Sequence, residues 1–298
     1  MRSGYVALVG KANAGKSTLM NVLVGEKVAI VSPKPHTTRN RILAVCNVEE
    51  GQIVFVDTPG IYKAKTELST RMLRSTELSA KEVDLIAYVV DGHKPLQEDD
   101  ITLMQKFLQN NIPMCIIYTK LDILQQQKLI DDSQLLFDAG ITCPLFPISA
   151  RTGKNIQKLK DSLLRLLPER EKIFGDDILT DKSTKFMIAE IMREKILLKY
   201  QKEIPHGVAI VIHQFEQNKK GTYLINLDII CEKQNHKAIL IGKQSYALKE
   251  VLTFARQDME KLLECKVFLT AFVKVQENWR DREHLLKEFG YAMHEDKL

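Results

Sequence analysis

The stretch GKANAGKST, residues 10–18, places a lysine and two hydroxyl groups directly after closely spaced glycines. It fits the pattern G-x-x-x-x-G-K-[ST], follows the apolar run YVALVG and precedes a helical pattern, which is the context that this motif requires. Such glycines let backbone N–H groups surround phosphate oxygens, and the helix start adds partial positive charge. Lys16 would supply a full charge to the β- and γ-phosphates, and the Ser17 hydroxyl would bind Mg²⁺. A chance glycine-rich helix cap is the weaker interpretation. The candidate phosphate-binding residues are Gly10, Lys11, Ala12, Asn13, Ala14, Gly15, Lys16, Ser17 and Thr18.

A second candidate element is IVFVDTPG, residues 53–60, an apolar strand that ends in an aspartate and a glycine turn. Downstream of a phosphate loop, Asp57 can hold Mg²⁺ through water, and the Gly60 N–H can sense a γ-phosphate. DTPG alone would be an ordinary turn, and its place after this strand makes it specific. The element adds Asp57, Thr58, Pro59, Gly60 and Ile61 to the candidate site.

Between these elements lies the polar segment SPKPHTTRNR, residues 32–41, which has two prolines and no periodicity. A loop of this length inside a compact domain is usually functional or disordered. Thr38 is a candidate metal ligand when a γ-phosphate is present, which would order the loop, and hydrolysis would then release it. A solvated loop without a ligand is the alternative.

The tetrapeptide TKLD, residues 119–122, follows the apolar run IPMCIIY. A carboxylate at Asp122 can accept hydrogen bonds from guanine N1–H and the 2-amino group, a pair of donors that adenine lacks. Because unpaired polar groups reject the wrong ligand, Asp122 would select GTP over ATP. The Lys120 stem can pack over the base, and the Ala150 N–H in SAR can meet guanine O6. An ordinary strand-end turn is the weaker alternative. The candidate base-binding residues are Thr119, Lys120, Leu121, Asp122, Ser149, Ala150 and Arg151.

The elements that must position these residues alternate along the first half of the chain. We expect strands at 5–10, 83–91, 112–119 and 143–149, a strand pair at 41–57, and helices at 66–80, 97–110, 124–137 and 154–167. This alternation predicts an α/β domain with a mostly parallel sheet and helices on both faces. The pair at 41–57, with a tight turn at 49–51, is the expected antiparallel hairpin.

The pattern changes after Pro168. Residues 169–182 are polar and rich in turn formers, which is typical of a linker. A helix at 183–202, a hairpin at 206–233, the segment at 238–250, a helix to about 263 and a strand at 266–276 predict a separate α+β domain of order α-β-β-α-α-β. The expected division is therefore a first domain at 1–168, a linker at 169–182, a second domain at 183–276 and a C-terminal tail at 277–298.

Composition places the chain among ordinary globular proteins, with 45% hydrophobic and 27% charged residues. No apolar run approaches the roughly 20 residues of a membrane helix, and a motif that starts by Gly10 leaves no room for a signal peptide. Five scattered cysteines without a CxxC pair indicate reduced core thiols. A net charge of +5 gives weak support for a polyanionic partner.

The ordered motifs GKANAGKS, DTPG, TKLD and SAR resemble the TRAFAC class of P-loop GTPases. The segment HTTR, the second domain, the closing WRDREHLLKEFGY and the chain length narrow the resemblance to the Era family of bacterial GTPases, over nearly the whole chain. The resemblance implies a P-loop GTPase domain followed by a type II KH domain, with GTP, GDP and Mg²⁺ bound by the first. It also implies a potassium ion held by Asn13, because relatives hold this ion with an asparagine at the same position.

Two residues depart from the common GTPase pattern. Thr119 stands where the motif more often has asparagine, and a threonine can replace only one of the two hydrogen bonds to the phosphate loop. We therefore expect intact guanine selectivity with weaker binding. Ile61 stands where Ras-like enzymes carry a glutamine that orients water. Isoleucine cannot do this, so we expect slow intrinsic hydrolysis and assign no catalytic residue.

In the second domain, the resemblance implies binding of single-stranded RNA near the 3′ end of the small-subunit ribosomal RNA. A KH domain clamps about four nucleotides of backbone with a GxxG loop, and here the loop is Gly242-Lys243-Gln244-Ser245. Serine suits a helix start but lacks the φ freedom of glycine, so we expect altered loop geometry or lower affinity. The candidate RNA-binding residues are Ile241, Gly242, Lys243, Gln244, Ser245, Lys233, Lys237 and Lys249.

The surroundings of this loop agree with a nucleic-acid surface. Residues 219–249 contain six lysines and two acidic residues. The apolar residues Ile239, Leu240 and Ile241 are expected to line a base-binding groove. A hairpin packed on helices, with its lysines as a solvated face, is the alternative.

The resulting hypothesis is a monomeric GTP-hydrolysing factor that binds ribosomal RNA and assists assembly of the small ribosomal subunit. The alternative is a nucleotide-switched module whose second domain binds a protein or a membrane surface. The expected location is the cytoplasm. The resemblance adds a peripheral position at the inner face of the cell membrane, for which the sequence shows no lipidation motif.

Overall fold

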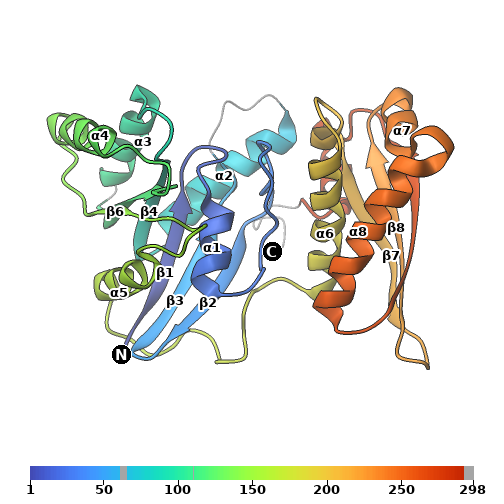
Figure 1. Ribbon diagram of the computed structural model, residues 1–298, viewed down its shortest axis with the longest axis horizontal. Helices are drawn as coiled ribbons and strands as arrows, with labels where there is room; N and C mark the ends of the chain where they lie inside the picture. Colours follow the sequence, from blue (N-terminus) through green and yellow to red (C-terminus); the bar gives the residue numbers. More distant parts are fainter. Residues whose placement is uncertain (61–65, 110, 292–298) are drawn as a thin grey trace. The chain divides into compact units, whose positions relative to one another are not determined.

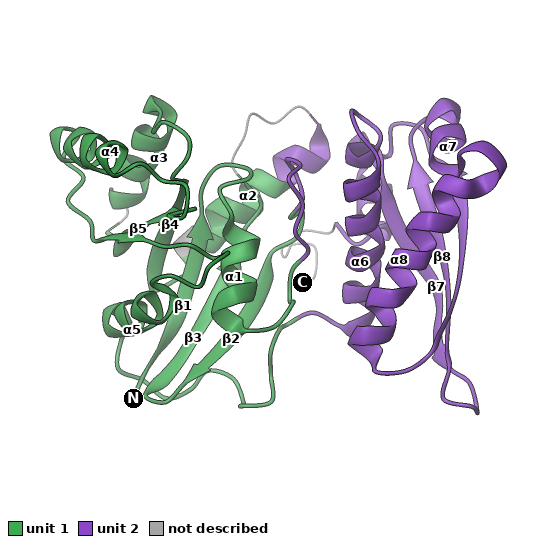
Figure 2. Cartoon of the chain, in the orientation of Figure 1, with its two compact units in different colours: residues 1–29, 38–63, 72–181 green, residues 30–37, 64–71, 182–298 purple. Residues whose placement is uncertain are grey.

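The computed structural model of the protein describes residues 1–60, 66–109 and 111–291, which form two compact units (Figures 1 and 2). The first unit comprises residues 1–29, 38–63 and 72–181, and the second comprises residues 30–37, 64–71 and 182–298. Two short segments of the N-terminal half, 30–37 and 64–71, therefore cluster with the C-terminal half. This grouping differs from the division expected from sequence, in which residues 1–168 form one domain.

The first unit is built on a six-stranded sheet of order β2-β3-β1-β4-β5-β6. Its elements are β1 (Arg2–Val9), α1 (Lys16–Val24), β2 (Ile42–Val48), β3 (Gly51–Asp57), the part of α2 (Glu67–Lys81) that follows residue 71, β4 (Leu85–Asp91), α3 (Glu98–Leu108), β5 (Met114–Thr119), α4 (Gln126–Asp138), β6 (Leu145–Pro147) and α5 (Ile156–Leu166). β2 runs antiparallel to β3, and the other pairs are parallel. The expected α/β class and its hairpin are confirmed.

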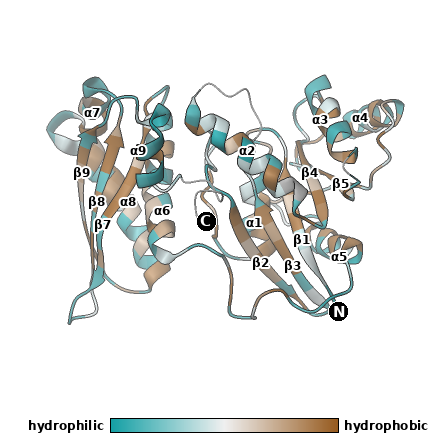
Figure 3. Ribbon diagram, turned by 180° about the vertical axis from the view of Figure 1, so that it is seen from behind, coloured by the Kyte–Doolittle hydropathy of each residue, from teal (hydrophilic) through white to brown (hydrophobic). Residues whose placement is uncertain are grey.

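The strands of this sheet are buried on both faces, as parallel strands usually are. Met104 and Phe107 of α3 and Leu136 of α4 pack on one face, against β1, β4 and β5. Helices α1 and α5 contact β3, the neighbour of β1. Hydropathy colouring shows the strands as the most apolar elements (Figure 3).

The polar stretch that follows α5 lies along the first unit. Ile173 and Phe174 pack against Leu43 and the neighbouring valines of β3. The Thr180 hydroxyl donates to the Leu43 carbonyl at 2.7 Å, and Ala44 forms an isolated bridge with Thr180. These contacts cover the free edge of β2, which an exposed strand edge requires.

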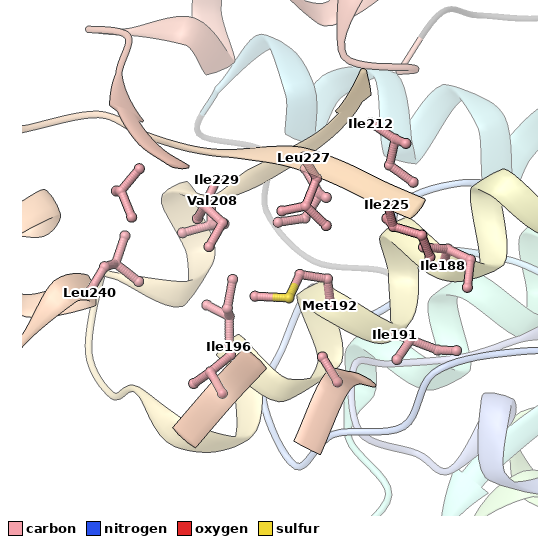
Figure 4. Close-up of a cluster of buried hydrophobic side chains, with 14 of the residues drawn as sticks. Ile188, Ile191, Met192, Ile196, Val208, Ile212, Ile225, Leu227, Ile229 and Leu240 are labelled. Atoms are coloured by element: carbon pink, nitrogen blue, oxygen red, sulfur yellow. The ribbon is translucent and has the colours of Figure 1, made fainter. Parts of the chain in front are cut away.

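The second unit contains a three-stranded sheet of order β7-β8-β9. Its elements are α6 (Thr184–Lys199), β7 (Ala209–Gln217), β8 (Tyr223–Cys231), α7 (Gln234–Ile241), α8 (Tyr246–Leu263), β9 (Val267–Val275) and α9 (Glu283–Glu288), with 3₁₀ turns at 205–207, 243–245 and 279–281. This is the expected α-β-β-α-α-β order. Its core joins Met192 and Ile196 of α6 to apolar residues of both hairpin strands (Figure 4).

Residues 279–291, expected as part of a tail, are folded within the second unit. Trp279 is fully buried, and its indole Nε1–H donates to the Gly207 carbonyl at 2.9 Å. Its ring stacks on Tyr291 at a centroid distance of 5.7 Å and meets Phe289 edge-on at 5.6 Å. These contacts make the segment part of the packed unit. Among the described residues, no helix is both long and apolar enough to cross a membrane.

Candidate functional site

The parallel sheet brings the sequence-predicted nucleotide residues to one edge. Register pairs Leu8 with Asp57 on neighbouring strands, and pairs Asp91 with Thr119. The phosphate loop follows β1 directly, and TKLD continues from β5. Because carboxyl ends of parallel strands meet at the same edge, this is where α/β sheets place ligands.

The loop at residues 10–15 closes around the Lys16 ammonium. Lys16 is 6% exposed, and its Nζ donates to the carbonyls of Gly10 at 2.9 Å and Lys11 at 3.0 Å. Gly15 caps α1 with φ 95°, in the left-handed region that favours glycine. Burial lowers the pKa of Lys16 to about 8, and the charge of Asp57 opposes this shift. An anion in the loop would therefore stabilise the charged lysine.

The DTPG turn lies against the phosphate loop. A Cβ on Gly60 would come within 2.8 Å of the Ala12 Cα, so only glycine fits this approach. The Thr58 hydroxyl donates to the Leu8 carbonyl at 2.9 Å, and the Pro59 carbonyl accepts from Thr76 at 3.1 Å. The Thr58 side chain thus holds the turn on the sheet. Ile61, a predicted site residue, lies outside the described residues.

Ser17, Thr38 and Asp57 form a compact oxygen cluster. The Ser17 hydroxyl donates to Asp57 Oδ2 at 2.6 Å, Thr38 Oγ1 lies 3.1 Å from the same oxygen, and the two hydroxyls are 2.9 Å apart. Neighbouring ligands of an octahedral Mg²⁺ with bonds of about 2.1 Å lie about 3.0 Å apart. Asp57 Oδ1 is buried without a hydrogen-bond partner among the described residues. The hydroxyl spacing and this unsatisfied oxygen both fit a magnesium site.

The charge state of Asp57 depends on its neighbours. The carboxyl group is fully buried, and burial raises its pKa, while the Lys16 charge and the bonds from Ser17 and Thr38 lower it. A divalent cation would favour the ionised form further. Among the described residues no cluster of three His, Cys, Asp or Glu side chains could hold a metal. A magnesium site of hydroxyls and one carboxylate does not need one.

Asp122 is held in place by two side chains of the SAR segment. The Ser149 hydroxyl donates to Asp122 Oδ1 at 2.5 Å, and the Arg151 guanidinium donates to Oδ2 through Nε at 2.9 Å and Nη2 at 2.6 Å. The Ser149 bond, followed by Arg151, lowers the pKa of Asp122. The carboxylate is therefore ionised and oriented. Oδ1 retains one acceptor site for a further donor, while the Arg151 guanidinium occupies both sites of Oδ2. The neighbouring Leu121 N–H donates to the Ile148 carbonyl at 2.9 Å, which ties TKLD to the SAR segment.

Thr119 joins this region to the phosphate loop. Its hydroxyl lies 2.8 Å from the Ala14 carbonyl and 3.1 Å from the Val90 carbonyl, and it is buried. One hydroxyl proton can serve only one of these acceptors fully. The structure thus gives Thr119 a single full bond, and its best-placed acceptor lies in the phosphate loop.

Some supporting residues were not identified from sequence. The Lys120 ammonium forms an ion pair with the Asp91 carboxylate at 2.7 Å, and Lys120 has a φ of 61°. Lys11 donates to Asp100 at 2.8 Å and to Gln97 at 2.7 Å. The sequence feature that could have identified Asp91 was its position at the end of an apolar strand, like that of Asp57. The partners of Lys11 lie far along the chain and carry no motif.

The loop at residues 242–245 lies between α7 and α8. Gly242 has φ 70°, and a Cβ there would come within 2.7 Å of the Ala247 Cβ. Gln244 and Ser245 also have positive φ, 49° and 62°. Ser245 precedes α8 without forming a side-chain cap. Ser245 takes the left-handed conformation that a glycine would take.

The residues around this loop differ in exposure. Lys233, Lys243, Gln244 and Lys249 are exposed, while Lys237 and Ile241 are half-buried. Ile239 is 49% exposed, but Leu240 is fully buried in the core of the second unit (Figure 4). The expectation that Leu240 lines a base-binding groove is therefore wrong, because helix α7 turns it inward. Ile239 is the exposed apolar residue of this turn.

Comparisons with known proteins agree with both halves of this description. Residues 5–120 match a family described as 50S ribosome-binding GTPase, and residues 203–280 match the KH domain family. GTPase Era of Clostridium kluyveri is 41% identical over 291 residues, covering 98% of this chain and 99% of the relative. GTPase Era of Clostridium botulinum strain Langeland is 40% identical over 290 residues, covering 97% and 98%.

Two solved structures are similar along nearly the whole chain. One is a variant of Aquifex aeolicus Era bound to GDP·AlF₄⁻, with a TM-score of 0.94, 36% identity, and coverage of 98% of this chain and 100% of that one. The other is Era in complex with MgGDPNP and nucleotides 1506–1542 of 16S ribosomal RNA, with a TM-score of 0.93 at the same identity and coverage. Matched by both family models and by full-length relatives, the chain belongs to the Era family of GTPases.

Proposed function

We propose that this protein binds and hydrolyses GTP in its first unit and binds single-stranded RNA at the 3′ end of the small-subunit ribosomal RNA in its second. Through these activities it assists assembly of the small ribosomal subunit. The observation that carries the proposal is the pairing in one chain of a formed phosphate loop with a glycine-started loop between α7 and α8. The similar Era structure with MgGDPNP and 16S RNA supports both ligands.

Catalysis in the first unit would depend on positioning and on charge stabilisation, as in phosphoryl transfer generally. Lys16 and the backbone N–H groups of the loop hold the β- and γ-phosphates. Ser17 and Thr38 would hold Mg²⁺ directly and Asp57 through water, and this ion would neutralise charge on the phosphates. Gly60 brings its N–H beside the phosphate loop. No residue is assigned to orient the attacking water.

Both proposed sites are built from residues of this chain, which supports a monomer. All five cysteines are free, which suits the reducing cytoplasm where we place the protein.

Replacing Asp122 with asparagine tests the guanine site. An amide would set a donor against the guanine 2-amino group, so we expect GTP affinity to fall at least about a hundredfold. Xanthosine triphosphate, which carries an oxygen at that position, should bind the variant better than the wild type. Fluorescent nucleotide titration measures both. Asp138→Asn, the same change at an exposed position of α4, is the control. Unchanged GTP affinity in Asp122→Asn would exclude this role.

The proposed potassium ion rests on Asn13, an exposed loop residue with φ 65°, and on the family resemblance. We expect faster GTP hydrolysis in potassium than in sodium chloride at equal ionic strength. Asn13→Ala should remove the difference without abolishing GDP binding. Equal rates of the wild type in the two salts would contradict the potassium site.

Lys243→Glu tests RNA binding. An acidic residue in the clamp loop would repel the phosphate backbone, so we expect affinity for a single-stranded 3′-end RNA to fall about tenfold or more at low salt. Lys261→Glu makes the same charge change near the other end of α8 and should leave affinity within about twofold. Filter binding and crosslinking in cells measure the effect. If the Lys243→Glu protein crosslinks to RNA as strongly as the wild type does, the result favours the alternative, in which the second domain binds a protein or a membrane surface.

Ser245→Gly tests the cost of the left-handed serine. A non-glycine residue in this conformation costs about 1–2 kcal/mol, so the free energy of unfolding should rise by about 1 kcal/mol. RNA affinity should change less than about threefold, since the loop conformation is already formed. Glu264→Gly, at the other end of α8 with φ 52°, should stabilise the protein similarly. A large gain in RNA affinity for Ser245→Gly alone would mean that serine constrains the bound loop.

A further inference from the structure

The side chain of Lys11 leaves the phosphate loop and binds the start of helix α3. Its ammonium donates to Gln97 Oε1 at 2.7 Å and to Asp100 Oδ2 at 2.8 Å. The backbone of the same residue lines the loop, where the Lys11 carbonyl accepts from Lys16 Nζ at 3.0 Å and from the Ala14 N–H at 3.3 Å. Lys11 is thus held at both ends, and all of these residues belong to the first unit.

Asp100 is a buried carboxylate whose two oxygens both accept hydrogen bonds. It is 6% exposed, Oδ1 accepts from the Tyr88 hydroxyl at 2.9 Å, and Oδ2 accepts from the Gln97 N–H at 3.1 Å as well as from Lys11. Tyr88 is fully buried, and burial together with the Asp100 charge raises the pKa of its phenol, so the phenol stays protonated and is the donor. Asp100 is therefore oriented by other groups before it binds the lysine.

Strand β4 holds the loop residue that precedes Lys11. The Gly10 backbone packs so closely on this strand that a Cβ on Gly10 would come within 2.3 Å of the Val89 carbonyl oxygen. Lys16 Nζ donates to the carbonyls of both Gly10 and Lys11. The two acceptors of the phosphate-binding ammonium are therefore held from outside the loop, one by β4 and the other by α3.

We propose that Asp100 is a positioning residue for nucleotide binding. Through the Lys11 ammonium it fixes the loop segment whose carbonyls hold Lys16, so the phosphate loop is formed before a nucleotide arrives. Without Asp100 the loop spends less time in the binding-competent arrangement, and the affinity falls by the same fraction. GTP and GDP share the β-phosphate that this loop holds, so both lose affinity alike. The inference rests on the proposed nucleotide site and adds a residue of α3 to it.

The test is Asp100→Asn in the full chain. The amide can still accept a hydrogen bond but carries no charge, so Lys11 loses its ion pair. We expect KM for GTP to rise about tenfold and kcat to stay within about twofold, because Asp100 touches no reacting atom and its loss weakens the ground state and the transition state equally. GDP affinity, measured by fluorescent nucleotide titration, should fall by the same factor. Thermal unfolding checks that the variant is folded.

A double-mutant cycle with Lys11→Met shows whether Asp100 acts through Lys11. Lys11→Met should lower GDP affinity about tenfold as well, and the double variant should bind GDP within about twofold of either single variant. Losses that multiply in the double variant would show that Asp100 does not act through Lys11, which overturns the inference. If Asp100→Asn does not fold, Lys11→Met decides alone, and an unchanged KM for GTP counts against the proposal.

Asp132→Asn is the matched control. Asp132 is 7% exposed on α4 in the same unit, and it forms an ion pair with Lys128 of the same helix. This change should lower stability similarly and leave KM for GTP unchanged. The inference is also overturned if folded Asp100→Asn keeps the wild-type KM and GDP affinity, or if Asp132→Asn raises KM as much. A wild-type protein that binds neither nucleotide would overturn the nucleotide site itself.

Discussion

The free-energy cost of burying charge shapes the first unit. Lys16 and Asp57 are both almost inaccessible to water, where ionised groups are destabilised unless partnered. Burial lowers the pKa of the lysine to about 8 and raises that of the aspartate, and each charge stabilises the other. The sheet makes this possible because their positions follow neighbouring parallel strands. Phosphates and a divalent cation would supply the missing charge on both sides, so ligand binding and stability of the site are linked.

The same edge explains how much could be predicted from sequence. Each nucleotide motif is a local pattern that follows an apolar strand, and the parallel sheet gathers such strand ends without further information. Asp57, Thr119 and Asp122 could therefore be placed together from sequence. The partners of the neighbouring lysines could not, since Asp91 and Asp100 bind Lys120 and Lys11 through tertiary contacts. A motif indicates which residue faces the ligand, but it does not indicate which other residues orient that side chain.

One expectation in the second unit failed because of helix geometry. The run Ile239–Ile241 was expected to line one groove, but its helical period of 3.6 turns successive side chains to different faces. Leu240 therefore enters the core while Ile239 stays exposed. Ser245 lies in a loop that passes through positive φ, and Gly242 at the start of this loop packs closely against Ala247. Here tertiary geometry overrides the local preference.

Two segments outside the motifs pack within their units, although their composition does not predict this. Residues 169–181 look like an open linker, yet their polar groups bond the β2 edge, and a polar sequence is what an edge cover needs. The closing segment carries the single tryptophan of the chain. Complete burial of so large a side chain is not compatible with a loose tail.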